Sequence, residues 1–166
     1  MEPVDTRQPT VYLMTGLPAS GKTTYAAALA QATGALRLNA DEYVAAHFTA
    51  EESHADWDTC FAAAAEAIWA IADAQIAAGK DVILDIGFWT RENRDAAKAR
   101  FTQPQARCVI YYMDTPEAEI LARLEKRTGE IARRNVQNFE NLKKIFQPPE
   151  KDENALYIKP SDKPAG

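Results

Sequence analysis

The sequence predicts an α/β fold in which helices cover a mostly parallel, five-stranded sheet. Runs of β-branched and apolar residues, typical of buried strands, begin near positions 10, 36, 81, 107 and 155. Helical patterns separate these runs, and strands that alternate with helices build parallel sheets. A glycine-containing loop joins the first strand to the first helix. The 166 residues suit a single domain, in which we expect residues 1–9 and 160–166 to be a loose leader and tail.

The loop that follows the first strand, 10–15, has the sequence GLPASGKT at 16–23 and matches the pattern G-x-x-x-x-G-K-T. A helical pattern runs from Lys22 to Thr33, and Gly34 ends it. In this order of strand, loop and helix, backbone N–H groups and the helix N-terminus concentrate positive charge on phosphate oxygens. We therefore predict a nucleotide-binding loop, in preference to a turn that only connects two elements.

The loop residues have distinct expected parts in binding ATP. Lys22 is expected to reach the β- and γ-phosphates, the Thr23 hydroxyl is placed to bind Mg²⁺, and Thr24 is expected to contact a phosphate from the next position. Ser20 is expected to act through its backbone N–H. The predicted ATP contacts in this segment are Gly16, Pro18, Ala19, Ser20, Gly21, Lys22, Thr23 and Thr24.

A second strand, 36–39, leads to Asp41, beside the place where the loop must lie. Phosphoryl transfer to an alcohol needs a carboxylate that orients the hydroxyl and accepts its proton, so Asp41 is a candidate catalytic base. The alternative is that Asp41 only caps the helix that starts at Glu42, as aspartate often does.

The third strand, 81–85, ends in Asp85, which we expect to act at the Mg²⁺ site through a water molecule. Phe88 and Trp89 follow at the sheet edge where α/β proteins bind ligands, so both are candidates for the substrate pocket. Packing against the next helix is the alternative. Before this strand, the alanine-rich stretch 49–79 is predicted to be a long helical region that packs on the sheet and walls the substrate.

Arginines gather in the second half of the chain. Arg91 opens the predicted helix 91–101 and is a candidate for the substrate pocket, although a solvated helix face also carries such residues. After the fourth strand, 107–114, Arg123 and Arg127 lie four residues apart on one helix face. Such a cluster suggests a mobile lid that excludes water and adds positive charge.

Within this lid, Arg127 is the predicted catalytic contact to phosphate, and Arg123 is expected to lie against the adenine by its guanidinium plane. Arg133 and Arg134 are ambiguous, since they also balance nearby glutamates. A short last strand is predicted at 155–159.

Composition narrows the class of protein. The formal net charge of −5 argues against a broad surface for polyanions, so nucleic acid is a disfavoured partner, while a local basic groove stays open. Cys60 and Cys108 have no metal-ligand spacing, and we expect both to be reduced core residues. No apolar run was expected to reach membrane-spanning length, and residues 1–5 lack signal-peptide features, so the prediction is a cytoplasmic protein with no membrane contact.

Together these motifs resemble a family. GLPASGKTT at 16–24, NADEY at 39–43, Asp85 with GFWTRENRD at 87–95, and the stretch from Arg123 to Arg127 are similar to the small P-loop kinases grouped with polynucleotide kinase, zeta-toxin and chloramphenicol phosphotransferase. The resemblance implies a three-layer P-loop NTPase fold with strand order 2-3-1-4-5. It also implies ATP and Mg²⁺ as co-substrates, Asp41 as base, and an arginine lid at Arg123 and Arg127.

The chain departs from this family at two positions. Ala19 stands where many relatives have a third loop glycine, although members similar to chloramphenicol phosphotransferase also have alanine there. Val44 stands where polynucleotide kinases have an arginine that clamps the phosphate of the substrate. The second departure disfavours a phosphorylated or nucleic-acid substrate and favours a small hydroxyl-bearing acceptor, such as a metabolite or an antibiotic.

The leading hypothesis is therefore an ATP-dependent kinase that transfers the γ-phosphoryl group to a hydroxyl of a small molecule. A 5′-hydroxyl polynucleotide or nucleoside kinase is an alternative, and it would need a basic groove built from Arg91, Arg94, Arg133 and Arg134. A zeta-toxin-like kinase of sugar nucleotides and a nucleotide switch without an acceptor are the others.

Overall fold

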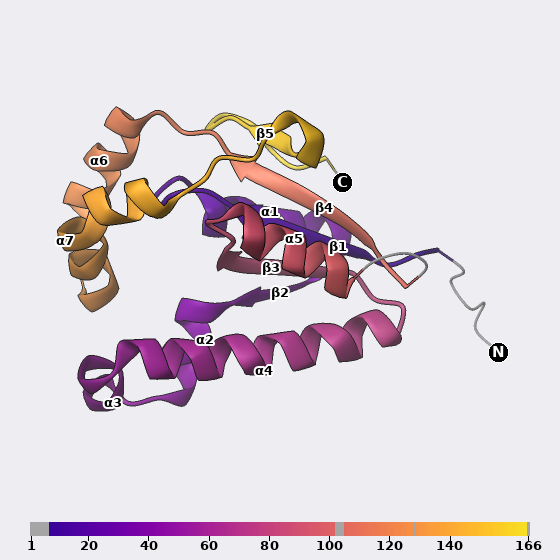
Figure 1. Cartoon of the computed structure of the whole chain (residues 1–166), viewed down its shortest axis with the longest axis horizontal. Helices are drawn as coiled ribbons and strands as arrows, with labels where there is room; N and C mark the ends of the chain where they lie inside the picture. The colour runs from indigo at the N-terminus through magenta and orange to yellow at the C-terminus, as the bar shows by residue number, and fades with distance from the viewer. Residues whose placement is uncertain (1–6, 102–104, 128, 166) are drawn as a thin grey trace.

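The computed structural model describes residues 7–101, 105–127 and 129–165, and Figure 1 shows their arrangement. Residues 1–6 of the expected leader lie outside this part. The described end of the leader is attached to the sheet, because Pro9 O accepts a hydrogen bond from Arg107 N at 2.8 Å. The elements are β1 (Thr10–Thr15), α1 (Lys22–Thr33), β2 (Leu36–Asn39), α2 (Ala40–His47), α3 (Ala50–Ala55), α4 (Trp57–Ala77), β3 (Val82–Gly87), α5 (Arg91–Arg100), β4 (Arg107–Met113), α6 (Glu117–Lys126), α7 (Glu130–Ile145), the 3-10 helix η1 (Lys151–Glu153) and β5 (Leu156–Ile158).

The five strands form one sheet in the order β2-β3-β1-β4-β5, and every pair is parallel. This confirms the predicted fold class and strand order. The central strand β1 pairs with β3 through Val11 and Val82, and with β4 through Val11 and Cys108. Because all strands point the same way, the residues that follow β1, β2 and β3 come together at one edge of the sheet.

Helices cover both faces of the sheet and complete three layers (Figure 1). On one face, Ile68 and Ala72 of α4 and Ala97 of α5 pack on Leu13 and Leu84. On the other face, α1 covers the sheet, and its buried residues Tyr25, Ala26 and Leu29 pack against Met14, Ile83 and Met113.

The helical region predicted at 49–79 is two helices, α3 and α4, that separate at Asp56. Asp56 caps α4, because its carboxylate accepts a hydrogen bond from Thr59 N at 3.1 Å. Contrary to the sequence-based expectation, α4 is long and apolar enough to cross a membrane by length and composition, with a mean hydropathy of 1.3. Core helices also pass this test, and in the structure Ala64, Ile68 and Ala72 of α4 are fully buried against α2 and the sheet.

The helices α6 and α7 stand together beyond the carboxyl edge of the sheet (Figure 1). Ile120 and Leu124 of α6 and Phe139 of α7 share a small apolar cluster with Ala19 of the glycine-containing loop. The methyl group of Ala19 therefore joins the loop to this helical pair, at the position where a glycine would leave a gap. Ala19 adopts a left-handed conformation, with φ of 61°, which is uncommon for alanine.

Candidate active site

The loop between β1 and α1 is a narrow turn whose backbone faces a pocket. Gly21 directly precedes α1 with φ of 102°, a conformation that favours glycine, and so lets the helix N-terminus face the turn. Lys22 curls back over the loop and donates hydrogen bonds from Nζ to Gly16 O at 2.8 Å and Leu17 O at 2.7 Å. Thr115 Oγ1 donates to Ser20 O at 2.7 Å, which fixes the turn from the side of β4.

Lys22 is the charged centre of this turn. Burial lowers its pKa to about 8, against the opposing effect of the carboxylates of Asp85 and Asp41. A bound polyanion would favour the charged ammonium and so reverse the effect of burial. The surroundings of Lys22 therefore favour the binding of an anion at this turn.

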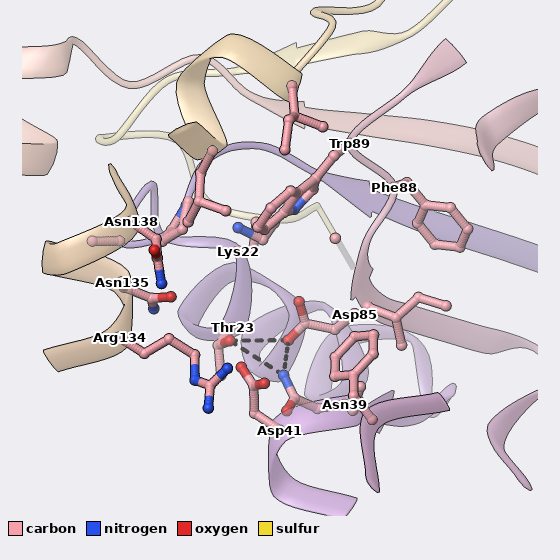
Figure 2. Close-up of a pocket in the computed structure, with 18 of the residues that line it drawn as sticks. Lys22, Thr23, Asn39, Asp41, Asp85, Phe88, Trp89, Arg134, Asn135 and Asn138 are labelled. Carbon is pink, nitrogen blue, oxygen red and sulfur yellow. Dashed lines mark hydrogen bonds between the residues drawn. The ribbon is translucent and has the colours of Figure 1, made fainter. Parts of the chain in front are cut away.

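Three side chains from three elements meet next to Lys22. Thr23 Oγ1 donates to Asp85 Oδ2 at 3.0 Å, and Asn39 Nδ2 donates to the same oxygen at 2.8 Å (Figure 2). Arg37 Nη1 lies 3.5 Å from it. Asp85 lies inside β3, two residues before its end, and is 4% exposed. Its charge is thus held by an amide, a hydroxyl and a guanidinium.

The Thr23 and Asp85 pair fits a magnesium site. Hydroxyl and carboxylate oxygens are hard ligands, and Mg²⁺ bound to nucleotides takes one or two protein ligands and fills its sphere with water and phosphate. Within 7–101, 105–127 and 129–165, no group of three or more His, Cys, Asp and Glu side chains is placed to bind a metal. A nucleotide-bound ion that needs few protein ligands therefore agrees better with these residues than a metal held by the protein alone.

Asp41 lies in the first turn of α2 and is not its cap. Asn39 is the cap, since its Oδ1 accepts a hydrogen bond from Glu42 N at 2.9 Å. The Asp41 carboxylate makes no hydrogen bond to any residue that the structure describes, and Figure 2 shows it at the lower edge of the pocket. Burial, and then the charge of Asp85, raise the pKa of Asp41, while Lys22 acts in the opposite direction.

These groups line a pocket of about 710 Å³ (Figure 2). Trp89 lines it and is half-buried, and its indole lies close over Gly87, where an added Cβ would come within 2.5 Å of Nε1. Phe88 borders the pocket with its backbone, but its ring turns into the core and meets the Trp69 ring edge-on, with centroids 6.1 Å apart. The packing alternative thus describes the Phe88 ring, and only Trp89 presents its ring to the pocket.

Arg91, a predicted pocket residue, does not line this pocket. Its guanidinium binds the carboxylate of Asp152 at 2.7 Å and 2.9 Å and also Asp95 at 3.1 Å. The neighbouring Arg94, three residues on, faces inward and is completely buried. Arg91 and Arg94 lie one turn apart on the same side of α5. Arg94 is held in the interior by Glu153, whereas Arg91, the first residue of the helix, is held at the surface by Asp152.

The lid arginines take different places. Arg127 follows α6, is exposed, and borders both the pocket above and a second pocket of about 650 Å³. Arg123 borders only the second pocket and donates from Nη1 to Ala19 O at 3.1 Å. The expected stacking of Arg123 on adenine remains a prediction.

The second pocket lies on the other side of the loop. It is lined by Tyr25 and Met113 and by 160–164, part of the tail that the sequence analysis expected to be loose. Lys159 N donates to Asp162 Oδ2 at 2.8 Å, so a local turn shapes this segment. Gly21, Thr24 and Arg127 border both pockets, which therefore meet across the loop.

One wall of the first pocket comes from α7; sequence reasoning left Arg134 ambiguous and did not predict Asn135 and Asn138. Arg134, Asn135 and Asn138 face the pocket from this helix (Figure 2). The guanidinium of Arg134 lies over the ring of Trp57, with 4.7 Å from Cζ to the ring centroid. The i, i+4 spacing of 134 and 138 was visible in the sequence, but the position of α7 over the pocket depends on tertiary packing.

Known proteins resemble this chain in sequence and in fold. The sequence profile of the AAA domain family matches residues 11–149. No curated protein is similar enough in sequence to count as a match. A sugar kinase from Janibacter sp. HTCC2649 is 21% identical with a TM-score of 0.67, and the match covers 92% of this chain and 86% of that chain.

Two further solved structures hold nucleotides. APS kinase CysC from Mycobacterium tuberculosis, in complex with AMPPNP and APS, is 19% identical with a TM-score of 0.60, over 94% of this chain and 90% of that chain. Kti12 from Chaetomium thermophilum, in complex with ADP-AlF3, is 19% identical with a TM-score of 0.64, over 92% and 90%. At these identities the likeness establishes the fold.

Proposed function

The chain belongs to the AAA domain family and has the fold of P-loop kinases, and from this premise we propose that it is an ATP-dependent kinase. In this proposal the γ-phosphoryl group is transferred to a hydroxyl of a small molecule. The observation that carries the proposal is the placement of Asp41 in the same pocket as Lys22 and the Thr23 and Asp85 pair. A base for an acceptor hydroxyl and a phosphate-binding turn thus face a common space.

In this proposal the second pocket binds ATP and the first pocket binds the acceptor. The second pocket, beside Tyr25 and Arg123, suits the base and ribose of ATP, and the triphosphate would follow the turn to Lys22. Mg²⁺, when bound through Thr23 and through water on Asp85, would supply charge neutralisation between the phosphates. The first pocket is left for the acceptor, with Trp89, Asn135 and Asn138 on its walls.

The residues of the chain would act mainly by position and charge. Asp41 would orient the acceptor hydroxyl and take its proton as the oxygen attacks phosphorus. Lys22 and Arg127 would stabilise the negative charge on the transferring oxygens, and α6 with α7 would exclude water from the reaction. The raised pKa of Asp41 suits a base, since a base closer to the operating pH accepts a proton more readily.

Other functions are less well supported. Arg91 binds Asp152 and Arg94 binds Glu153, so two of the four arginines that a nucleic-acid groove would need are already paired. A zeta-toxin-like kinase of sugar nucleotides would share the chemistry of the proposed site and differ only in the acceptor. A nucleotide switch would give Asp41 no role, although this residue lines a pocket that also holds Lys22.

The test is mass spectrometry of reactions that contain Mg²⁺ and ATP with a panel of small alcohols, sugars, antibiotics, nucleosides and 5′-hydroxyl oligonucleotides. A product heavier by one phosphoryl group, absent with Asp41→Asn, is the expected result. AMPPNP binding by Asp41→Asn should stay within about twofold of the parent, because this residue contacts the acceptor side of the pocket. Unchanged transfer by the variant would remove Asp41 from the mechanism, and hydrolysis of ATP without any product would favour the switch.

A further inference from the structure

Arg134 is the basic residue on the acceptor side of the first pocket. Three basic residues line this pocket, and they differ in their surroundings. Lys22 donates to carbonyls of the turn, and Arg127 stands where the two pockets meet, near enough to influence the pKa of Lys22. Arg134 instead influences Asp41 and lies on Trp57 of α4. Lys22 and Arg127 thus lie on the side of the pocket that the phosphate turn forms, and Arg134 lies beside the candidate base, Asp41.

The guanidinium of Arg134 is stacked on an aromatic ring but has no hydrogen-bond partner among the residues that the structure describes. It makes no hydrogen bond or ion pair with any residue in the described part of the chain, and its Nε is a buried donor without an acceptor. Its face is occupied by the Trp57 ring, so its N–H groups are free at the edges. A buried donor without a partner is costly, and a planar guanidinium stacked on an aromatic ring presents its edge to a carboxylate or phosphate.

The surroundings of Val44 bear on the source of positive charge in this pocket. In the polynucleotide kinases that the sequence resembles, an arginine here clamps the phosphate of the substrate, and valine at this position disfavours a phosphorylated or nucleic-acid substrate. In this structure Val44 is 2% exposed and packs against Cys60 and Ala64, so this position of α2 offers the pocket no positive charge. Arg134 supplies a positive charge from α7, on a different element but near the same carboxylate, Asp41.

We propose that Arg134 binds an anionic group of the acceptor, a carboxylate or a phosphate that lies near the hydroxyl to be phosphorylated, with Asn135 and Asn138 beside it. This inference rests on the proposed kinase function. It narrows the acceptor to a hydroxyl compound that also carries an acidic group, such as a hydroxy acid or the phosphate ester of a polyol.

The first experiment uses inorganic sulfate as a probe, so it does not depend on knowing the acceptor. The protein is saturated with AMPPNP and Mg²⁺, which fill the phosphate turn, and sulfate binding is measured by calorimetry. Arg134→Gln should weaken sulfate binding roughly 10- to 100-fold, because charge-assisted hydrogen bonds are lost. The sulfate affinity of Arg134→Lys should lie between the affinities of the parent and of Arg134→Gln. The matched control is Lys144→Gln, which removes one positive charge from an exposed position of α7 and should change the affinity less than about twofold.

Equal sulfate affinity in the parent, Arg134→Gln and Lys144→Gln would overturn the proposal. AMPPNP affinity, measured in the same variants, separates this failure from failure of the proposed kinase function. A protein that does not bind AMPPNP at all refutes the kinase, and the difference in sulfate affinity between the nucleotide-free parent and nucleotide-free Arg134→Gln then still reports on Arg134.

The second experiment compares acceptors that differ by one acidic group. Glycerol 3-phosphate is paired with glycerol, and gluconate with sorbitol, so the two pairs distinguish phosphate from carboxylate. We expect a higher kcat/KM for the anionic member of at least one pair and loss of that preference in Arg134→Gln. A preference for the neutral member in both pairs would overturn the proposal. An equal loss for both members of a pair would also overturn it, because Arg134 would then serve the transferred phosphoryl group.

Discussion

Arg94 and Glu153 form an ion pair in which both side chains are completely buried, with 2.6 Å between Nε and Oε1 and 3.0 Å between Nη2 and Oε2. The remaining nitrogen, Nη1, donates to Phe88 O at 3.1 Å and to Gln147 O at 2.9 Å. One guanidinium thus ties α5 to the loop that carries Trp89 and to the segment that follows α7. The wall of the first pocket depends on this contact.

Replacement of Arg94 by methionine should destabilise the protein by about 3–5 kcal/mol, because Glu153 would be left buried without its partner. The matched control on the same helix is Arg100→Met, which breaks an exposed ion pair with Asp73 and should cost less than about 1 kcal/mol. Urea unfolding measures both values. Similar losses of unfolding free energy in the two variants would show that the buried ion pair contributes no more to stability than the exposed one.

Binding of ATP near pH 8 should take up protons. Burial lowers the pKa of Lys22 to about 8, so about half of the free protein has a neutral amine at that pH, and bound phosphates favour the charged form. The affinity should therefore fall as the pH rises above 8, and it should be nearly flat at pH 6 to 7. Calorimetry in buffers with different ionisation enthalpies counts the protons. Lys22→Met should bind more weakly and lose the uptake; uptake of the same size in this variant would assign it to another group.

Asn39 has two roles that substitution can separate. Asn39→Ser retains a cap for α2 but removes the amide that donates to Asp85, so stability should change by less than about 0.5 kcal/mol while transfer falls about tenfold or more. Asn39→Ala removes both the cap and the amide donor, and it should also lower the free energy of unfolding by about 1 kcal/mol. Thermal unfolding and the Mg²⁺ dependence of transfer are the measurements. Full activity of Asn39→Ser would show that the amide contact to Asp85 is dispensable.

Arg91 and Arg127 should differ sharply in their effect on catalysis. Arg91→Gln removes a surface ion pair with Asp152 outside the pocket and should leave kcat/KM within about twofold. Arg127→Gln removes a charge where the two pockets meet, and kcat should fall by roughly a hundredfold or more. Steady-state kinetics with any acceptor found by the panel decides this. A large loss with Arg91→Gln would return that residue to the substrate site.

The acid limb of the pH profile should lie above the ordinary aspartate value of about 3.9. Burial and the charge of Asp85 raise the pKa of Asp41, so transfer should decline earlier as the pH falls and the base becomes protonated. Arg134 acts in the opposite direction, and Arg134→Gln should therefore move the limb to still higher pH. Lys144→Gln should not move it. A limb that stays in place in Arg134→Gln would mean that the two groups do not interact.

The sheet and the phosphate turn were predictable because local signals agree with the global fold. The apolar strands, the pattern GLPASGKT and the glycine after α1 each report on their own neighbourhood. The Asn39 cap also had a local signal, because asparagine is a favoured capping residue and Glu42 follows three positions later. The break between α3 and α4 at Asp56 had a similar signal, a capping residue with Thr59 three positions later.

The rest of the candidate site depends on contacts between distant segments. Arg91 and Arg94 are three residues apart on one helix, and only the packing of α5 decides that one reaches the surface and the other the interior. Arg134 lines the pocket because α7 lies over the pocket and the guanidinium stacks on the ring of Trp57. No local pattern reports these arrangements, since the first arises from the packing of α5 and the second from the docking of α7 over the pocket.

Gln147, the residue just beyond Phe146 at the end of α7, is bound to the start of α5 through both its main chain and its side chain. Its N donates to Trp89 O at 2.7 Å, and its Oε1 accepts from Arg91 N at 2.9 Å. This end of α7 is therefore tied to the loop before α5 and to the first residue of α5, so any outward movement of the helix would be largest at its opposite end. Such a movement would widen the pocket beside Arg134, while the wall near Trp89 would keep its shape.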